Sequence, residues 1–173
     1  AAEKPGEMDA IGLPHPRVKF LPLLRNLYTW NKLFRRDFWQ RQDLWFREGV
    51  AYEDQPIITQ LFACARAIDV IPDVVYRYRM RDDQSSISQQ TASPKDLRQR
   101  IEAWEETRRV LRAEGLDHVY DGWLQTLFDA HFHWYLRSPG IADDDYWREL
   151  VTAVRSFSAD ASPEIWRATG PAR

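Results

Sequence analysis

The sequence predicts an α+β fold that is mostly α: a small piece with two or three strands, followed by a helical bundle. Three observations point to it. The 173 residues include 13% aromatic residues, with 8 Trp, but only 7 Gly, which suits helices packed through rings better than a β-sandwich. Apolar residues recur at helical spacing after residue 93. Short runs rich in Val, Ile and Tyr, at 67–70 and 74–80, are typical of strands.

The chain divides into three parts. Residues 1–17 contain several Pro and Gly residues and indicate an irregular lead-in. Residues 18–92 hold the predicted strands and two or three helices. Residues 93–173 are predicted to be helical throughout.

Short sequence signals predict individual helices within residues 18–92. We expect a short helix after Pro22 and another from Trp30 to Trp39, which has an apolar face. Asp54 is a preferred cap residue, and Pro56 falls in the first turn, where its missing N–H costs little, so a helix should begin there. The two strands follow, separated by Pro72 and Asp73.

The helical part shows clear starts and ends. Ser93 and Pro94 open a long helix that Gly115 ends. A second helix is predicted from Asp117 to Arg137, a third after residues 143–145, and a short last one from Ser162. We expect the three longer helices to pack through four tryptophans: Trp104, Trp123, Trp134 and Trp147.

Composition excludes several classes of protein. The 24 Lys and Arg against 26 Asp and Glu leave a net charge of −2, without the basic excess of a nucleic-acid binder. A single cysteine, Cys64, excludes an internal disulfide. No apolar run reaches the ~20 residues of a membrane span, and the first residues lack a signal-peptide pattern. We expect a cytoplasmic protein, either free or at the inner face of the membrane, with the helical tail as the surface for any oligomer.

Two clusters could carry chemistry. Glu53 and Asp54 lie where the predicted helix begins, and the helix dipole would keep a carboxylate there ionised and able to accept a proton from a sugar hydroxyl. Alternatively, Asp54 is only a cap and Glu53 only solvated. The second cluster is an arginine face on the second strand, formed by Arg77, Arg79 and Arg81 and followed by a Ser-rich loop. Guanidinium groups and hydroxyls suit phosphate oxygens. Alternatively, these arginines form a solvated edge.

Metal ligation is not expected. His131 and His133 are two residues apart, so on a helix they point in different directions. The acidic run at residues 143–145 lies where helix starts favour acids. Lys32, polar on an otherwise aromatic helix, could face a phosphate or simply water.

Three segments, in order, resemble one family. Residues 30–38 (WNKLFRRDF), residues 49–54 (GVAYED) and residues 68–79 (IDVIPDVVYRYR), the last followed by SSIS at 85–88, are similar to motifs of family 2 glycosyltransferases. Within that family, the segments most resemble the bacterial branch that builds cell-surface polymers such as teichoic acid. The resemblance covers residues 24–90, less than half of the chain.

The resemblance implies a GT-A fold and inverting transfer of a sugar from a nucleotide-sugar donor to a glycan or polymer acceptor. Asp54, beside Glu53, would be the catalytic base. The residues implied at the donor diphosphate are Arg79, Arg81, Ser85 and Ser86, to which we add Lys32.

One departure from the family is large. No Asp-x-Asp precedes Trp30, so the metal-binding, nucleotide-binding half that the family places first is missing. The chain therefore resembles the acceptor-side half of a transferase, with Mg²⁺ or Mn²⁺ expected only in the full-length parent. We expect the isolated chain to be inactive and to bind nucleotide weakly. The alternative is a non-catalytic helical interaction module.

Overall fold

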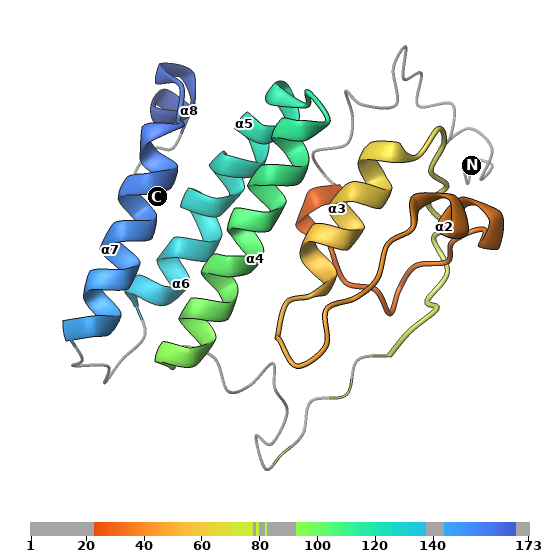
Figure 1. The fold of residues 1–173 in the computed structure, drawn as a ribbon, viewed down its shortest axis with the longest axis horizontal. Coiled ribbons are helices and arrows are strands. Elements are labelled where there is room, and N and C mark those ends of the chain that lie inside the picture. Colours follow the sequence, from red (N-terminus) through yellow and green to blue (C-terminus); the bar gives the residue numbers. More distant parts are fainter. Residues whose placement is uncertain (1–22, 78, 80–81, 83–92, 138–143, 169–173) are drawn as a thin grey trace.

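The computed structural model describes residues 23–77, 79, 82, 93–137 and 144–168, and these residues are helical or irregular (Figure 1). Their elements, in chain order, are η1 (Leu23–Arg25), α2 (Arg36–Gln42), α3 (Asp54–Cys64), α4 (Pro94–Ala113), α5 (Asp117–Thr126), η3 (Leu127–His131), α6 (Phe132–Leu136), α7 (Asp144–Ala159) and α8 (Pro163–Ala168).

The described residues contain no β-strand, so the predicted α+β class and its GT-A-like strand piece are wrong. Residues 67–70 and 74–77 are irregular, and no backbone hydrogen bond joins them to another described residue. A strand needs a partner, because its N–H and C=O groups must be satisfied by an adjacent strand. The apolar pattern identified residues that favour extended backbone, but it could not supply the neighbour.

The helix predicted from Trp30 to Trp39 is also largely wrong. Only the short α2 forms, beginning at Arg36, and Leu33 is fully exposed. Apolar spacing alone did not give the segment a surface to pack on, and helices this short depend on such packing. The helix expected after Pro22 is reduced to η1. The lead-in, residues 1–17, lies outside the described residues.

The predicted starts of α3 and α4 are confirmed. Asp54 is the first residue of α3. At α4, Ser93 Oγ accepts a hydrogen bond of 3.1 Å from the Asp96 N–H, and Pro94 is the first helical residue. Gly115 ends α4 with a φ of 62°, a conformation that glycine adopts without a steric penalty.

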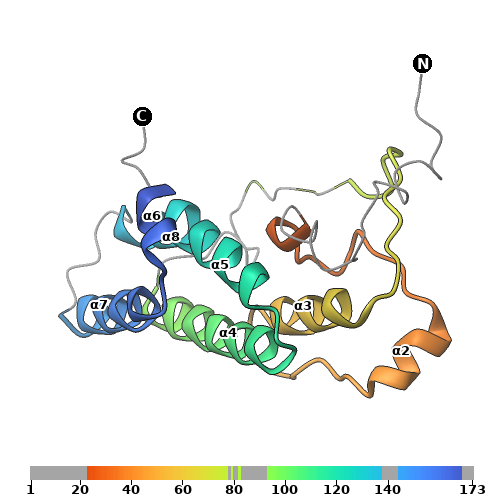
Figure 2. The ribbon, with the colours of Figure 1, turned by 90° about the horizontal axis from the view of Figure 1, so that it is seen from above.

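Three near-parallel rods form the bundle: α4, the continuous rod α5–η3–α6, and α7 (Figure 1). The middle rod contains one π turn, η3, between two α-helical stretches. From above, α5, α6 and α8 form a layer over α4 and α7 (Figure 2). On the other side of the bundle, α3 packs against α4. No helix of the described residues is long and apolar enough to cross a membrane.

Trp104 lies at the centre of the core with 1% of its surface exposed. Its ring contacts Phe132, Tyr135 and Phe157 edge-on or tilted, with centroids 5.0, 5.9 and 6.3 Å away. Trp123 is buried too, but Trp134 is 61% exposed. The predicted packing is therefore confirmed for Trp104 and Trp123 and wrong for Trp134. Trp147 is partly buried and packs against the core cluster, as predicted. One core cluster joins residues of η1 and α3 to residues of the bundle.

Candidate functional site

The start of α3 presents the two candidate carboxylates. Glu53 precedes the helix and Asp54 begins it, and both are partly buried. The turn into the helix is closed by Gln55, whose N–H donates to the Tyr52 carbonyl at 3.1 Å. Tyr52 has a φ of 65°, which is costly for a residue with a bulky side chain and persists only where neighbours hold it.

Those neighbours come from the helical bundle. The Tyr52 hydroxyl donates to Asp96 Oδ1 at 2.5 Å, and the Tyr135 hydroxyl donates to Asp96 Oδ2 at 2.7 Å. The Arg100 guanidinium lies over the Tyr52 ring, with Cζ 3.5 Å from the centroid, and its Nε donates to the Tyr135 oxygen at 3.4 Å. Helices α4 and α6 therefore anchor the residue that precedes Glu53 and Asp54.

Asp54 is in an environment that disfavours its charge. Burial raises the pKa of Asp54 above its usual value, and the neighbouring Glu53 carboxylate raises it further. The Arg100 charge and the Asp54 and Gln55 backbone N–H groups act in the opposite direction. We expected the helix start to favour the ionised form, but burial outweighs it. A carboxylate with a raised pKa is a stronger base wherever it remains ionised.

Lys32 lies close enough to Asp54 for their charges to interact. Burial lowers the pKa of Lys32 to about 8, and the Asp54 charge opposes that change. The ammonium donates to the Tyr28 carbonyl at 2.6 Å and to the side-chain oxygens of Asn31 and Asn26 at 2.8 and 3.2 Å. These three acceptors match the three N–H groups of an ammonium, so Lys32 can act on a ligand through its charge.

Aromatic rings join the first and third motif segments. The Trp30 ring lies 4.4 Å from that of Tyr76 and 5.2 Å from that of Tyr28, centroid to centroid. The three rings are 40–54% exposed. These ring contacts join the first and third of the segments that carry the family resemblance, and the second segment is related to the first through the effect of the Asp54 charge on Lys32.

The arginine face is only partly placed. Arg77 and Arg79 are exposed. Arg81, Ser85 and Ser86 lie outside the described residues, so the predicted diphosphate cluster is not assembled by the part that the structure describes.

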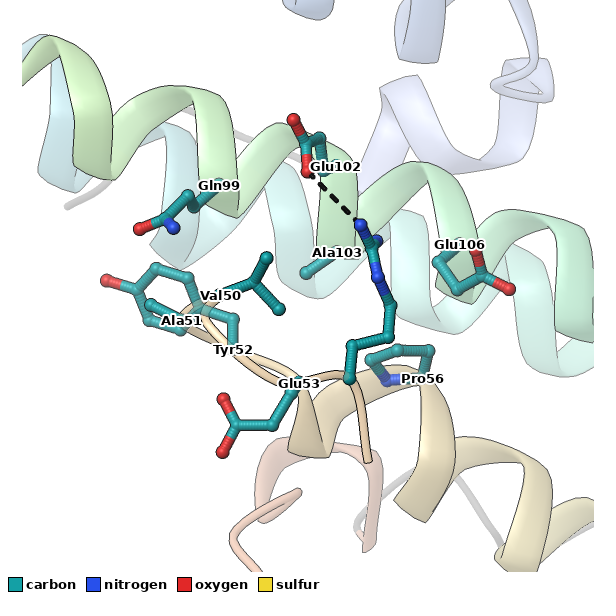
Figure 3. A pocket seen from close by; sticks show the side chains of 10 residues that line it. Val50, Ala51, Tyr52, Glu53, Pro56, Gln99, Glu102, Ala103 and Glu106 are labelled. Carbon is teal, nitrogen blue, oxygen red and sulfur yellow. Dashed lines mark ion pairs between the residues drawn. The ribbon is translucent and has the colours of Figure 1, made fainter. Parts of the chain in front are cut away.

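A shallow groove lies between α4 and the loop that leads into α3 (Figure 3). Its empty space is about 240 Å³ even when the open solvent above it is counted. Arg47 and Glu102 face each other at 4.0 Å at its edge, whereas the Glu53 carboxylate points away from α4 (Figure 3). This groove is too small to hold a nucleotide sugar.

No cluster of three or more His, Cys, Asp or Glu side chains in the described residues is arranged to hold a metal ion. The described residues thus offer no fit for the Mg²⁺ or Mn²⁺ that the resemblance implies for the parent. His131 is partly buried instead beside Trp104, with ring centroids 6.0 Å apart. Burial lowers its pKa to about 4, and the Arg100 charge contributes.

Sequence reasoning missed the support behind the candidate base. The sequence marks Asp96 only as an acid three residues after the helix cap Ser93, and it assigns no role to Arg100 or Tyr135. The available signal was spacing: Asp96 and Arg100 are one turn apart on α4, so they share a face. Their meeting with Tyr52 depends on how α3 packs on α4, which spacing does not report.

Comparison with known proteins finds no matching family model, no matching curated protein and no matching solved structure.

Proposed function

We propose that the chain contributes the acceptor side of an inverting glycosyltransferase that moves a sugar from a nucleotide-sugar donor to a cell-surface glycan or polymer. The observation that carries the proposal is the contact between the first and third motif segments, in which the Trp30 ring lies 4.4 Å from that of Tyr76. The charge of Asp54, in the second segment, also raises the pKa of Lys32 in the first. The proposal concerns these residues and not a GT-A sheet, which the described residues lack.

Asp54 is the proposed general base. Its carboxylate would take the proton of an acceptor hydroxyl while that oxygen forms a bond to the anomeric carbon and the bond to the nucleoside diphosphate breaks. The leaving diphosphate carries the electron pair away. Its partly buried site makes Asp54 a stronger base than a solvated aspartate, and Arg100 limits the rise so that the carboxylate can still ionise.

The leaving diphosphate needs compensating positive charge. We assign this role to Arg79 and Arg81, with Ser85 and Ser86 as hydroxyl donors and Lys32 acting through its charge. Because the groove beside Glu53 is smaller than a nucleotide sugar, residues 1–173 alone should not transfer sugar. Calorimetry of this chain with uridine diphosphate and manganese should give no saturable heat at micromolar ligand; a micromolar dissociation constant would contradict this.

The base assignment is tested in the natural polypeptide that contains these residues. Asp54→Asn should keep the circular dichroism spectrum and lower turnover by about 10²–10⁴-fold, the contribution of a positioned base. Asp129→Asn, an exposed acid on η3, is the matched control and should retain wild-type turnover. Turnover of Asp54→Asn within a few-fold of wild type would reject Asp54 as the base.

A non-catalytic interaction module is the second candidate. The observation that favours it is the exposure of large apolar side chains on the described surface, among them Leu33 at 100%, Trp45 at 80% and Val74 at 78%. Such groups often mark protein interfaces. This candidate predicts that Asp54→Asn changes no activity, whereas Trp45→Ala weakens binding to a partner protein.

A further inference from the structure

The stretch from residue 67 to 77 is an exposed apolar segment that leaves the end of α3. It runs on the side of the molecule that holds α2 and α3, away from α7 (Figures 1 and 2). It is irregular, with one bend at Asp73. Five apolar side chains in it are 44–78% exposed: Val70, Ile71, Val74, Val75 and Tyr76. Exposure of this many large apolar groups in one short segment indicates a surface that another body covers.

The backbone of this segment is also unpaired within the described structure. No backbone hydrogen bond links residues 67–77 to another described residue. Val, Ile and Tyr are the residue types that favour strands, and an unpaired row of N–H and C=O groups is a template for pairing with another chain. The occupant that fits best is therefore an extended segment.

Charge distribution identifies which extended segment. Asp69 and Asp73 lie in the first half, and Arg77 and Arg79 lie in the second; all four are exposed. In a parallel pair of two such segments, aspartate would lie near aspartate. In an antiparallel pair, the acidic half of one copy faces the basic half of the other, and directly opposite unlike charges are favourable. The segment is thus complementary to itself in one orientation only.

We propose that residues 73–77 form an antiparallel strand pair with the same residues of a second copy, across a two-fold axis at Val75. In this register Asp73 of each copy lies opposite Arg77 of the other. Pro72 has no N–H to donate, and the register can be accommodated by making Val75 a hydrogen-bonded pair, because Pro72 then falls at a position whose N–H points outward. The interface is isologous, as a two-fold axis requires.

The molecule already holds one side of this segment in place. The Tyr76 ring packs on Trp30, and side chains alternate along an extended chain, so Val75 and Arg77 lie on the opposite face from Tyr76. The bend at Asp73 must straighten for the pair to form. A short two-stranded pair is marginal by itself, so we expect a weak dimer that also covers Val70, Ile71 and Val74.

Charge exchange tests the proposal on the 173-residue chain, with mass measured by sedimentation equilibrium over a range of concentrations. Wild type should show a reversible monomer–dimer equilibrium. Asp73→Arg and Arg77→Asp, made separately, each place like charges opposite one another and should raise the dissociation constant about tenfold or more. The double variant restores unlike pairs and should return to the wild-type value.

Mixing the two single variants is the most direct test of the opposed charges. Asp73→Arg chains and Arg77→Asp chains should each be mostly monomeric alone but form a heterodimer together, because every opposed pair is then unlike. Arg137→Asp, at an exposed position after α6, is the control for charge change and should dimerise as wild type does. Val75→Lys should abolish association without loss of helical signal.

Three results would overturn the proposal. A wild-type chain that is monomeric at every concentration would mean that this surface is covered by another segment or another protein. A dimer that tolerates both single exchanges would place the interface elsewhere, for example in the helical tail. Absence of a heterodimer on mixing would reject the antiparallel register.

Discussion

The Tyr52 hydroxyl donates a hydrogen bond of 2.5 Å to Oδ1 of Asp96, which is 8% exposed. This bond crosses from the loop before α3 to the first turn of α4. The second carboxylate oxygen accepts from Tyr135 of α6 at 2.7 Å. One buried carboxylate thus ties three segments together, and it holds the residue of positive φ that precedes Glu53 and Asp54.

Removing either tyrosine hydroxyl should destabilise the fold. Burial raises the pKa of both hydroxyls, so they remain protonated donors at neutral pH. Tyr52→Phe and Tyr135→Phe should each lower the free energy of unfolding by about 1.5–3 kcal/mol, as for a hydrogen bond to a charged group. Urea denaturation at pH 7 measures it. Tyr28→Phe, at an exposed ring, should change it by less than about 0.5 kcal/mol; equal effects at all three positions would contradict the role of Asp96.

Trp104 and Trp134 should differ sharply when replaced by alanine. Trp104→Ala removes a ring that is 1% exposed and should cost about 3–5 kcal/mol of unfolding free energy. Trp134 is 61% exposed, so Trp134→Ala should cost less than about 1 kcal/mol. Urea denaturation followed by circular dichroism compares them. Similar losses for both would mean that the core is not centred on Trp104.

His131 should make the fold sensitive to acid. Its pKa is lowered to about 4 in the folded chain, against about 6.5 in the unfolded chain. Above pH 6.5 both states hold a neutral imidazole; below it the unfolded chain takes up the proton first. Stability should therefore fall by roughly 2–3 kcal/mol between pH 6.5 and 4 on account of this residue.

The variant His131→Gln isolates this contribution. The free energy of unfolding, measured at pH 7, 6, 5 and 4.5, should fall less steeply in His131→Gln than in wild type. Asp54, whose raised pKa acts in the opposite direction on acidification, is present in both and cancels in the comparison. His133→Gln is the matched control and should keep the wild-type slope. Parallel curves for wild type and His131→Gln would show that His131 is not buried in neutral form.

Local signals determined where the main helices begin and end. Ser93 with Pro94, Pro56, and Gly115 mark these boundaries because a cap, a first-turn proline and a left-handed glycine act within a few residues. At α3 the cap position is taken by Glu53, whose side chain makes no capping bond, and not by Asp54. The apolar stripes also identified Trp104 and Trp123 as core residues. These features depend on backbone groups and side chains that are neighbours in the sequence, so reading the sequence was enough.

Only the tertiary structure decided the features that depend on distant partners. Residues 67–77 have the composition of strands, but no described segment pairs with them, and pairing makes the strand. Trp134 has the same helical spacing as other core residues, yet it is 61% exposed, because α6 packs into the core through Phe132 and Tyr135. Asp54 begins a helix as predicted, but burial raises its pKa, since the packing of α3 on α4 and not the helix dipole sets its surroundings. Arg100 reaches Tyr52 for the same reason: a fold brings together residues whose separation in sequence carries no sign of the contact.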